Sequence, residues 1–339
     1  MEEMRGASAQ AYDEQETSFS TSLQQAVEDI NKQKISFSPR TKLVKGAVDK
    51  FYDGLKKDKN YVEPLGDYKA TIRSFIRDLM QKKWDTQVRN RCMNGGEYDQ
   101  GKQSCQCYGG YIGQFCERIM QDCTEGYNTH HYNKGSGIFL IHPYMAPSPF
   151  KVKCRMEYGG NTYIQIHDDG STHFNRSWQE YKDGFGDLTK DFWLGNDKIA
   201  YITNGRSQLL LFKTKDISST VYRQRIYKSF TLSQDGLYTM TYERSWAHIR
   251  PEYIGGDCLA ELKGQPFSTF DRDNDESPLN CAQEHQSGFW FKDCTPCNPN
   301  GVWSETPDKM RAGVPWEMFW TPVTGDHLIL SCFAFLKAE

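Results

Sequence analysis

Three aspartates occupy alternate positions, Asp271, Asp273 and Asp275, in the short polar stretch FSTFDRDNDESPLNCA at residues 267–282. A hard cation such as Ca²⁺ takes about six to eight oxygen ligands, and a loop with carboxylates at every second position can wrap around one. The stretch lacks the glycine and the distal glutamate that an EF-hand loop needs. A calcium site and a solvated acidic turn are both consistent with these residues taken alone.

The sequence carries no recognisable catalytic pattern. Its eight histidines are scattered, without a His-x-x-x-His pair on a recognisable helix. No Gly-x-Ser-x-Gly motif, phosphate-binding loop or dinucleotide fingerprint is found either. A metal ion would account for the clustered carboxylates, so we expect a protein that is not an enzyme.

Composition argues against two classes of partner. The 339 residues carry a formal net charge of −3, which gives no bulk attraction to nucleic acid or to an anionic membrane. No run of eighteen apolar residues exists, so we expect no transmembrane helix. Contact with a membrane surface stays open.

Cysteine usage points to an oxidising compartment. All eleven cysteines follow residue 91, and one glycosylation sequon begins at Asn175. The opening MEEMRGASAQAYDEQ has neither the basic nor the apolar region of a signal peptide. We expect a secreted, extracellular glycoprotein whose signal peptide has been removed from this chain.

The elements that must position these residues differ along the chain. Residues 1–20 are polar and acidic and predict a disordered tail. Apolar residues recur at helical spacing within 21–86, beginning with Leu23, Ala26, Val27 and Ile30, and predict three amphipathic helices. This segment could form a small bundle, an oligomerisation stalk or a membrane-active effector.

Residues 92–117 read CMNGGEYDQGKQSCQCYGGYIGQFCE and resemble an epidermal-growth-factor-like module that lacks the first and third of its usual cysteines. The two missing cysteines are partners of each other in that family. The resemblance therefore implies the disulfides Cys92–Cys105 and Cys107–Cys116. The spacing matches a zinc ribbon poorly.

Residues 120–339 resemble a fibrinogen C-terminal-like domain, as found in fibrinogen-related lectins of the ficolin and tachylectin kind. Alternating stretches such as YIQIH and turns at Asp-Gly and Asn-Gly agree with an α+β domain built of short strands and helices. The resemblance rests on the segments SGIFLIHP, FKVKCRMEYGGNTYIQ, DDGSTHFNRSWQEYKDGFGD, FWLGNDKI, FSTFDRDND and NPNGVW.

The resemblance also implies the disulfides Cys123–Cys154 and Cys281–Cys294. Because it assigns Cys294 to Cys281, a redox Cys-x-x-Cys site at 294–297 is disfavoured. Cys258, Cys297 and Cys332 remain, and sequence does not decide which two of them pair.

In fibrinogen-like domains, Ca²⁺ is held by side chains eight and six residues before the second disulfide's first cysteine and by carbonyls four and two before it. Counting back from Cys281 gives Asp273, Asp275, Ser277 and Leu279. Two carboxylates nearly neutralise a divalent ion. Asp271 falls outside this set, as a hydrogen-bond partner or a surface charge.

The lectins of this family bind acetylated sugars near the ion, beside a cis peptide that would here join Asp293 to Cys294. Aligned with their pocket are His285, Thr295, Met310 and Arg311, with Trp303 after Asn-Gly. These residues lack several acetyl-binding groups, so N-acetylglucosamine should bind weakly. Arg311 would suit an anionic sugar, or be a solvated surface arginine.

These features together lead us to expect a secreted calcium-binding recognition protein, acting as a homo-oligomer on a glycan or a cell-surface glycoprotein. One alternative is an extracellular protein-binding ligand or matrix-adhesion factor. Another is the targeting part of a membrane-active effector or toxin.

Overall fold

The computed structural model of the protein describes residues 92–132, 134–216, 221–247, 254–304, 316–321 and 328–339. The chain divides into two units, Met1–Lys82 and Lys83–Glu339, and all described residues belong to the second. The predicted tail, the predicted helical segment, Met310 and Arg311 lie outside the described residues.

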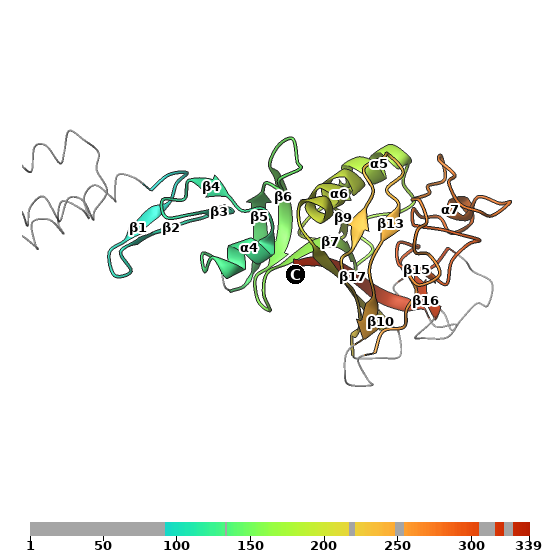
Figure 1. The fold of residues 1–339 in the computed structure, drawn as a ribbon. Coiled ribbons are helices and arrows are strands. Elements are labelled where there is room, and N and C mark those ends of the chain that lie inside the picture. The colour runs from blue at the N-terminus through green and yellow to red at the C-terminus, as the bar shows by residue number, and fades with distance from the viewer. Residues whose placement is uncertain (1–91, 133, 217–220, 248–253, 305–315, 322–327) are drawn as a thin grey trace, which may run out of the picture. The chain divides into compact units, whose positions relative to one another are not determined.

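A small four-cysteine module, residues 92–117, leads into the larger domain (Figure 1). Its disulfides join Cys92 to Cys105 and Cys107 to Cys116, the pairs that the resemblance implies. Two antiparallel hairpins organise this region. They are built from β1 (Glu97–Asp99), β2 (Ser104–Gln106), β3 (Tyr111–Ile112) and β4 (Arg118–Ile119).

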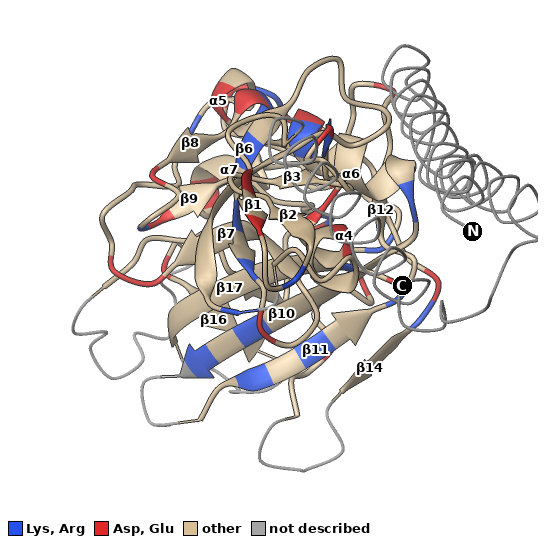
Figure 2. Ribbon diagram, turned by 90° about the vertical axis from the view of Figure 1, so that its left-hand side faces the viewer, with Lys and Arg blue, Asp and Glu red and all other residues tan. Residues whose placement is uncertain are grey.

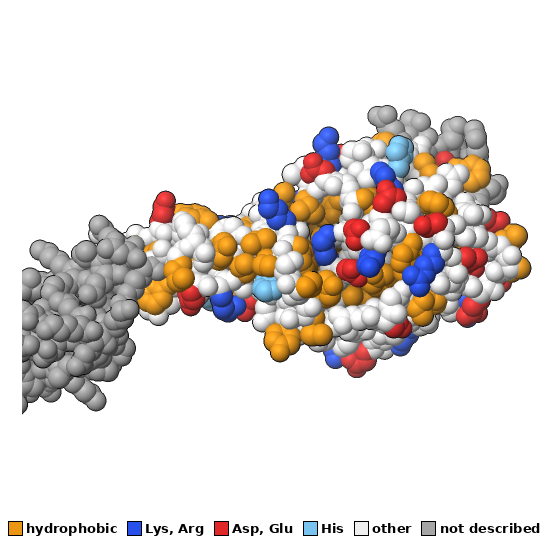
Figure 3. Space-filling view, turned by 90° about the horizontal axis from the view of Figure 1, so that it is seen from above, with side chains coloured by type: hydrophobic (Ala, Val, Ile, Leu, Met, Phe, Trp, Pro, Cys, Tyr) orange, Lys and Arg blue, Asp and Glu red, His pale blue; other side chains and the backbone are white. Residues whose placement is uncertain are grey.

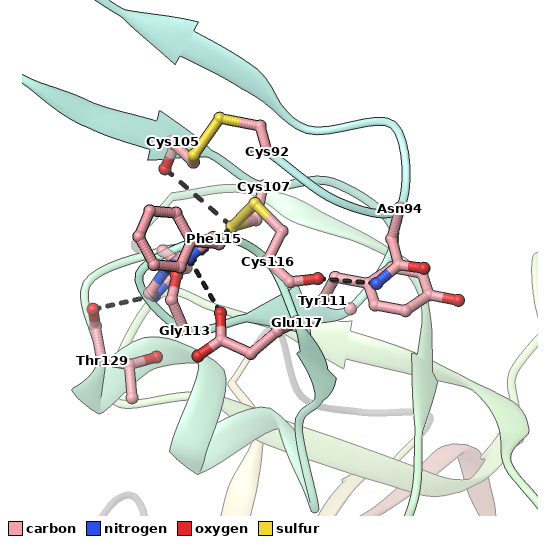
Figure 4. Close-up of a disulfide and its surroundings, with 12 residues drawn as sticks. Cys92, Asn94, Cys105, Cys107, Tyr111, Gly113, Phe115, Cys116, Glu117 and Thr129 are labelled. Atoms are coloured by element: carbon pink, nitrogen blue, oxygen red, sulfur yellow. Dashed lines mark hydrogen bonds between the residues drawn. A yellow bond between two sulfur atoms is a disulfide. The ribbon is translucent and has the colours of Figure 1, made fainter. Parts of the chain in front are cut away.

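Disulfides and polar contacts replace a large core in this module (Figure 4). Cys105, Cys107 and Cys116 are buried and form the centre of its apolar cluster. The Asn94 side chain donates to the Cys116 carbonyl at 2.7 Å. So short a segment cannot bury enough apolar surface to fold by hydrophobic packing alone, which explains the two cross-links.

The larger domain is built on a nine-stranded antiparallel sheet, in which the C-terminal strand β17 lies between β10 and β7 (Figure 1). The strand order confirms the expected α+β class once the helices below are added. In spatial order the sheet contains β14 (Ser245–Ala247), β11 (Arg223–Tyr227), β10 (Gln208–Asp216), β17 (Ile329–Ala338), β7 (Asn161–His167), β6 (Phe150–Arg155) and β5 (Ser136–Ile141), with β9 (Phe192–Trp193) on β7 and β8 (Phe185–Gly186) on β9.

Side-chain alternation determines which face of the sheet is buried. On β10, Gln208, Leu210, Phe212 and Thr214 are buried, whereas the residues between them are partly exposed. Successive side chains of a strand point to opposite faces, so one face of the sheet packs into the domain and the other meets solvent.

Helices cover the buried face of the sheet, and α5 and α6 lie above it in Figure 1. They are α4 (Cys123–Asn128), α5 (Trp178–Asp183) and α6 (Asn196–Gly205). Helix α5 begins with a capping box, in which Ser177 and Glu180 each bond the other's backbone N–H. In the described part of the chain, no helix is long and apolar enough to cross a membrane.

Apart from β14, the described residues between 231 and 321 contain little regular structure. They form β12 (Thr231–Leu232), β13 (Met240–Thr241), α7 (Cys281–Glu284), β15 (Cys297–Asn298) and β16 (Phe319–Trp320). Fully buried aromatic side chains, among them Phe267, Trp290 and Trp320, supply its core. Few of these loops are fixed by hydrogen-bonded strands, so aromatic packing and disulfides hold them in place.

Direct hydrogen bonds join the small module to the domain. Leu140 on β5 donates its N–H to the Gly109 carbonyl at 2.8 Å. The Tyr132 hydroxyl accepts from Gly110 N–H at 3.0 Å and donates to the Tyr111 carbonyl at 2.8 Å. Gly110 has φ +105°, and a Cβ there would collide with the Leu140 backbone, so this junction requires glycine.

Candidate functional site

The acidic loop starts from a buried anchor. Phe267 is fully buried against Tyr181 and Trp290, and Ser268 exchanges two backbone hydrogen bonds with Phe289. Asn274 then folds the loop back, since its side chain donates to the Phe267 carbonyl at 2.7 Å. The loop therefore leaves the core at a fixed point and direction.

Asp271 binds to the start of helix α5. Its carboxylate accepts from Trp178 N–H and from the Thr269 hydroxyl, each at 2.8 Å. A carboxylate at a helix N-terminus is stabilised by the unpaired N–H groups there. Asp271 is thus a hydrogen-bond partner, which is one of the two roles expected for it outside the calcium set.

Asp273 and Asp275 lie close together. Asp273 accepts from Asp275 N–H at 3.3 Å, and Asp275 accepts from Ser277 N–H at 3.0 Å and Cys281 N–H at 3.1 Å. Burial, together with the neighbouring Asp273 charge, raises the pKa of Asp275 to about 6. The two carboxylates therefore converge in one turn despite their mutual repulsion.

The donor set of this turn fits a hard cation. No described residue donates a hydrogen bond to the carbonyl oxygen of Ser277 or Leu279. These oxygens, together with the two carboxylates, are of the type that Ca²⁺ prefers. No group of three or more His, Cys, Asp or Glu is placed to hold a metal among the described residues, so a site here would combine two carboxylates with main-chain oxygens and water.

The turn is tied to the predicted ligand-binding segment. Cys281 begins helix α7 and is bonded to Cys294, as the resemblance implies. Glu276 N–H donates to the Lys292 carbonyl at 2.8 Å, and Lys292 N–H donates to the Cys294 carbonyl at 2.8 Å. The acidic turn is therefore linked to residues 292–294 by one disulfide and one backbone hydrogen bond.

Two predicted ligand residues are engaged within the fold. His285 is 6% exposed, with its ring stacked on Phe291 at 5.3 Å between centroids. The Thr295 hydroxyl donates to the Cys297 carbonyl at 2.7 Å. Asp293 is exposed beside them. Of His285, Asp293 and Thr295, Asp293 is the residue most exposed to solvent.

The expected cis peptide is not found. The described residues contain no cis peptide bond, so Asp293 and Cys294 are joined in the trans form. Trans is the lower-energy form of a non-proline peptide by about 3 kcal/mol. The prediction carried over from the acetyl-binding lectins is therefore wrong at this bond.

Trp303 is held by a different part of the domain. Its indole N–H donates to the Leu330 carbonyl at 3.0 Å, and a Cβ on Gly170 would collide with its ring. Asp191 holds the Gly170 turn in place by accepting from three successive backbone N–H groups, those of residues 168–170. The described contacts do not bring Trp303 to His285 or Thr295.

A buried amide network supports the segment and was not anticipated. Asn298 accepts from the Ser287 hydroxyl at 2.8 Å and donates to the His285 carbonyl at 3.0 Å. Asn300 donates to Gly288 O at 2.8 Å and accepts from Gln165 on β7 at 2.7 Å. The two asparagines of the NPNG segment are the sequence signal for this network, because a buried side-chain amide needs hydrogen-bond partners.

The cysteines that sequence could not assign are resolved. Cys258 is bonded to Cys297, and Cys332 on β17 is free and buried. Burial raises the pKa of the Cys332 thiol. Cys123 is bonded to Cys154, as the resemblance implies. Cys294 and Cys297 thus belong to separate disulfides, which leaves no dithiol for redox chemistry at this position.

The sheet, helices and disulfide-linked loops described above have known counterparts. The sequence matches the family described as "Fibrinogen beta and gamma chains, C-terminal globular domain" over residues 119–326, more than half of the chain. The chain belongs to this family.

Curated relatives share this region. Human fibrinogen-like protein 1 is 35% identical over 215 residues, covering 59% of this chain and 67% of the relative. Dog angiopoietin-1 is 35% identical over 211 residues, covering 61% of this chain and 41% of the relative. Bovine fibroleukin is 31% identical over 292 residues, covering 82% of this chain and 64% of the relative. The chain thus spans only part of each relative.

Solved structures agree on the fold. The fibrinogen-like globe domain of human ANGPTL2 has a TM-score of 0.59 and 29% identity, covering 65% of this chain and 99% of that one. The globe domain of human ANGPTL6 has a TM-score of 0.58 and 26% identity, covering 66% and 96%. Lamprey fibrin D-dimer, solved with the peptide Gly-His-Arg-Pro-amide, has a TM-score of 0.56 and 22% identity, covering 91% and 93%.

Proposed function

We propose that the protein is a secreted, non-enzymatic recognition protein that binds Ca²⁺ in the acidic turn and its ligand through the adjoining part of the fibrinogen-like domain. The observation that carries this proposal is the convergence of Asp273 and Asp275 beside two free carbonyls, next to the Cys281–Cys294 bridge. The role of the ion is structural, since it stabilises a loop with little secondary structure of its own.

The calcium proposal is tested by unfolding Asp273→Ala and the unchanged protein with and without Ca²⁺. A cation that binds the native state stabilises it by about 2.7 kcal/mol at a concentration of 100 Kd. We expect a higher Tm in Ca²⁺ for the unchanged protein and no calcium response for Asp273→Ala.

Asp271→Ala is the matched control, because Asp271 lies in the same loop but bonds to helix α5. It should lower the Tm in both conditions and keep the calcium response. Identical melting curves for all three proteins in Ca²⁺ and in chelator would reject the site.

The ligand is a glycan or a glycoprotein, and a protein partner is the second candidate. His285 and Thr295 already bond or stack within the fold, which leaves few of the oriented donors that an acetylated sugar needs. One similar structure is a complex with a peptide, and one relative is an angiopoietin. An anionic sugar remains the proposal for Arg311.

A glycan array and a panel of immobilised cell-surface proteins, each probed with and without chelator, separate these candidates. We expect ligand binding to fall in chelator, because the turn orders residues 292–294, and N-acetylglucosamine to bind weakly. Arg311→Ala should abolish binding to an anionic sugar, whereas Arg244→Ala serves as a control away from the loop. Binding that ignores both chelator and Arg311→Ala would place the site elsewhere.

Oligomerisation through residues 21–86 would raise the affinity of a weak single site. The alternative for that segment, an effector that disrupts membranes, predicts leakage of dye-loaded liposomes by the full chain. Sedimentation equilibrium and a leakage assay distinguish the two, and a monomer without leakage would reject both.

A further inference from the structure

The solvent-facing side of the main sheet carries a row of positive charges. On β10, partly exposed residues alternate with buried ones. The last two of the partly exposed residues are Lys213 and Lys215. Lys153 and Arg155 occupy alternate positions on β6, on the face opposite the buried Val152 and Cys154. Figure 2 shows basic residues along β10. The arginines of β11, Arg223 and Arg225, pair with Thr214 and Phe212 and so belong to the other face.

Aromatic rings lie beneath and between these cations. The Lys213 ammonium lies 5.5 Å from the centroid of Phe335, and the Lys153 ammonium lies 5.6 Å from that of Tyr163. Tyr163 and Phe335 touch, with centroids 4.4 Å apart. Phe335 is only 3% exposed although it points to this face, because the lysine stems and neighbouring rings cover it.

The rim of this face continues the pattern. The Arg155 guanidinium lies 4.8 Å from the ring of Tyr158, which is 75% exposed. The Lys215 ammonium lies 5.9 Å from the ring of Tyr222. We call Lys153, Arg155, Tyr158, Lys213, Lys215 and Tyr222 the basic sheet face.

Few of these charges are neutralised. Arg155 pairs with Glu157 at 3.8 Å, whereas Lys153, Lys213 and Lys215 form no ion pair with any described residue. Burial lowers the pKa of Lys213, and the positive charge of Arg155 lowers it further. The opposite side of the domain instead mixes acidic and basic side chains (Figure 3). An anion on the basic sheet face would relieve this like-charge repulsion.

We propose that the basic sheet face binds a linear sulfated polysaccharide. Lys153 and Lys213 belong to strands separated by two others, which places them roughly 14 Å apart across the sheet, a span that several linked sugars cover. Sulfate groups accept charge-assisted hydrogen bonds from the ammonium groups. The exposed rings of Tyr158 and Tyr222 offer flat apolar surfaces between the charges, against which sugar rings can pack.

The local charge pattern also disfavours other polyanions. With a net charge of −3, the chain as a whole does not attract duplex DNA, and the short basic sheet face offers cations to only a short stretch of a polyanion. The face belongs to a β-sheet and is not an amphipathic helix of the kind that enters a lipid surface.

The test measures binding of the full chain to a fluorescent heparin octasaccharide. Lys213→Met keeps the apolar stem over Phe335 and removes the charge, and it is combined with Lys153→Gln and Lys215→Gln. We expect the triple variant to bind at least tenfold more weakly, with the slope of log Kd against log salt reduced by about one for each lysine removed, as for other polyanions.

Lys263→Gln is the matched control, because Lys263 also lies over a tyrosine, Tyr242, at 4.9 Å but outside the basic sheet face. It should bind heparin as the unchanged protein does. Circular dichroism and the Tm of each variant show whether it is folded. If the triple variant does not fold, Lys215→Gln alone provides a milder change for the same binding measurement.

Binding should persist in chelator, because the basic sheet face does not depend on the acidic turn, so this result is independent of the calcium proposal. The proposal is overturned if desulfated heparin binds equally well, if phosphatidylserine vesicles or DNA bind more tightly than heparin, or if a folded triple variant binds as the unchanged protein does.

Discussion

His167 is a buried histidine that should make the fold sensitive to acid. It is 1% exposed and its ring stacks on Phe174, with centroids 4.0 Å apart. Burial lowers its pKa to about 3, whereas an unfolded histidine has a pKa of about 6.5. Between these pH values the unfolded chain binds a proton that the folded chain does not.

The free energy of unfolding should therefore fall by up to about 1.4 kcal/mol per pH unit below pH 6.5 through this one group. Urea unfolding at pH 7.5, 6 and 5 measures it. His167→Gln should reduce the slope, although it also loses some stability at all pH values. His173→Gln changes an exposed histidine whose charge is the smallest of the causes that shift the pKa of His167, so it should change the slope little. If the free energy of unfolding depends on pH equally in both variants, His167 is not the group responsible.

Asn175 should carry a glycan when the protein passes through a secretory pathway. It is exposed immediately before helix α5, and Ser177 of its sequon also caps that helix. Asn175→Gln should remove the glycan and keep the cap. Ser177→Ala should remove both, with a further loss of about 1 kcal/mol in helix stability. Enzymatic deglycosylation followed by mass spectrometry, with thermal unfolding of each variant, checks both parts.

At the level of residues, the position of the acidic turn can be found from the sequence more readily than the surroundings of the expected ligand pocket. Donor spacing is local, so Asp273 and Asp275 follow from counting along one loop. The surroundings of His285, Thr295 and Trp303 depend on long-range packing. Contacts with Phe291 and Leu330 and the buried amides of NPNG become visible only once the strands are assembled.

The junction between the small module and the domain depends on Tyr132, which follows helix α4. Tyr132→Phe keeps the ring packed on Phe139, at 4.9 Å between centroids, and removes both hydroxyl hydrogen bonds. We expect a loss of about 1–3 kcal/mol and faster hydrogen exchange at Gly110. Tyr144→Phe, at a site that is 82% exposed, is the control and should change neither. Unchanged exchange in Tyr132→Phe would mean that the hydroxyl does not hold the junction.

The disulfides of the module could be expected from its resemblance to an epidermal-growth-factor-like module, but its docking could not. Docking relies on backbone groups of residues 109–111, which any sequence would possess, together with one tyrosine hydroxyl. The role of Gly110, which is to admit the Leu140 backbone, depends on a contact with a strand thirty residues away.

For the whole molecule, this docking predicts that the module and the domain unfold together. Ile112 of the module is fully buried and belongs to the same apolar core as β5 and β17. Differential scanning calorimetry should therefore give no separate transition for residues 92–117, and their amides should exchange with those of β5. A distinct low-temperature transition lost on deleting the module would contradict this.

The fold of residues 120–339 could be predicted from a series of short motifs, because each one marks a turn or strand of a known arrangement. The basic sheet face could not, since its members come from β6, the turn after β6, β10 and the residue before β11, far apart in the sequence. Only strand order brings Lys153 and Lys213 to one surface.

The central position of β17 has a consequence for the order of folding. Its residues, 329–338, come later in the sequence than every other described strand of the sheet, yet both β10 and β7 pair with it. The two halves of the sheet therefore have no partner between them until this strand is added. Closure of the sheet is a late step in folding, and it waits for the strand that was synthesised after both of its neighbours.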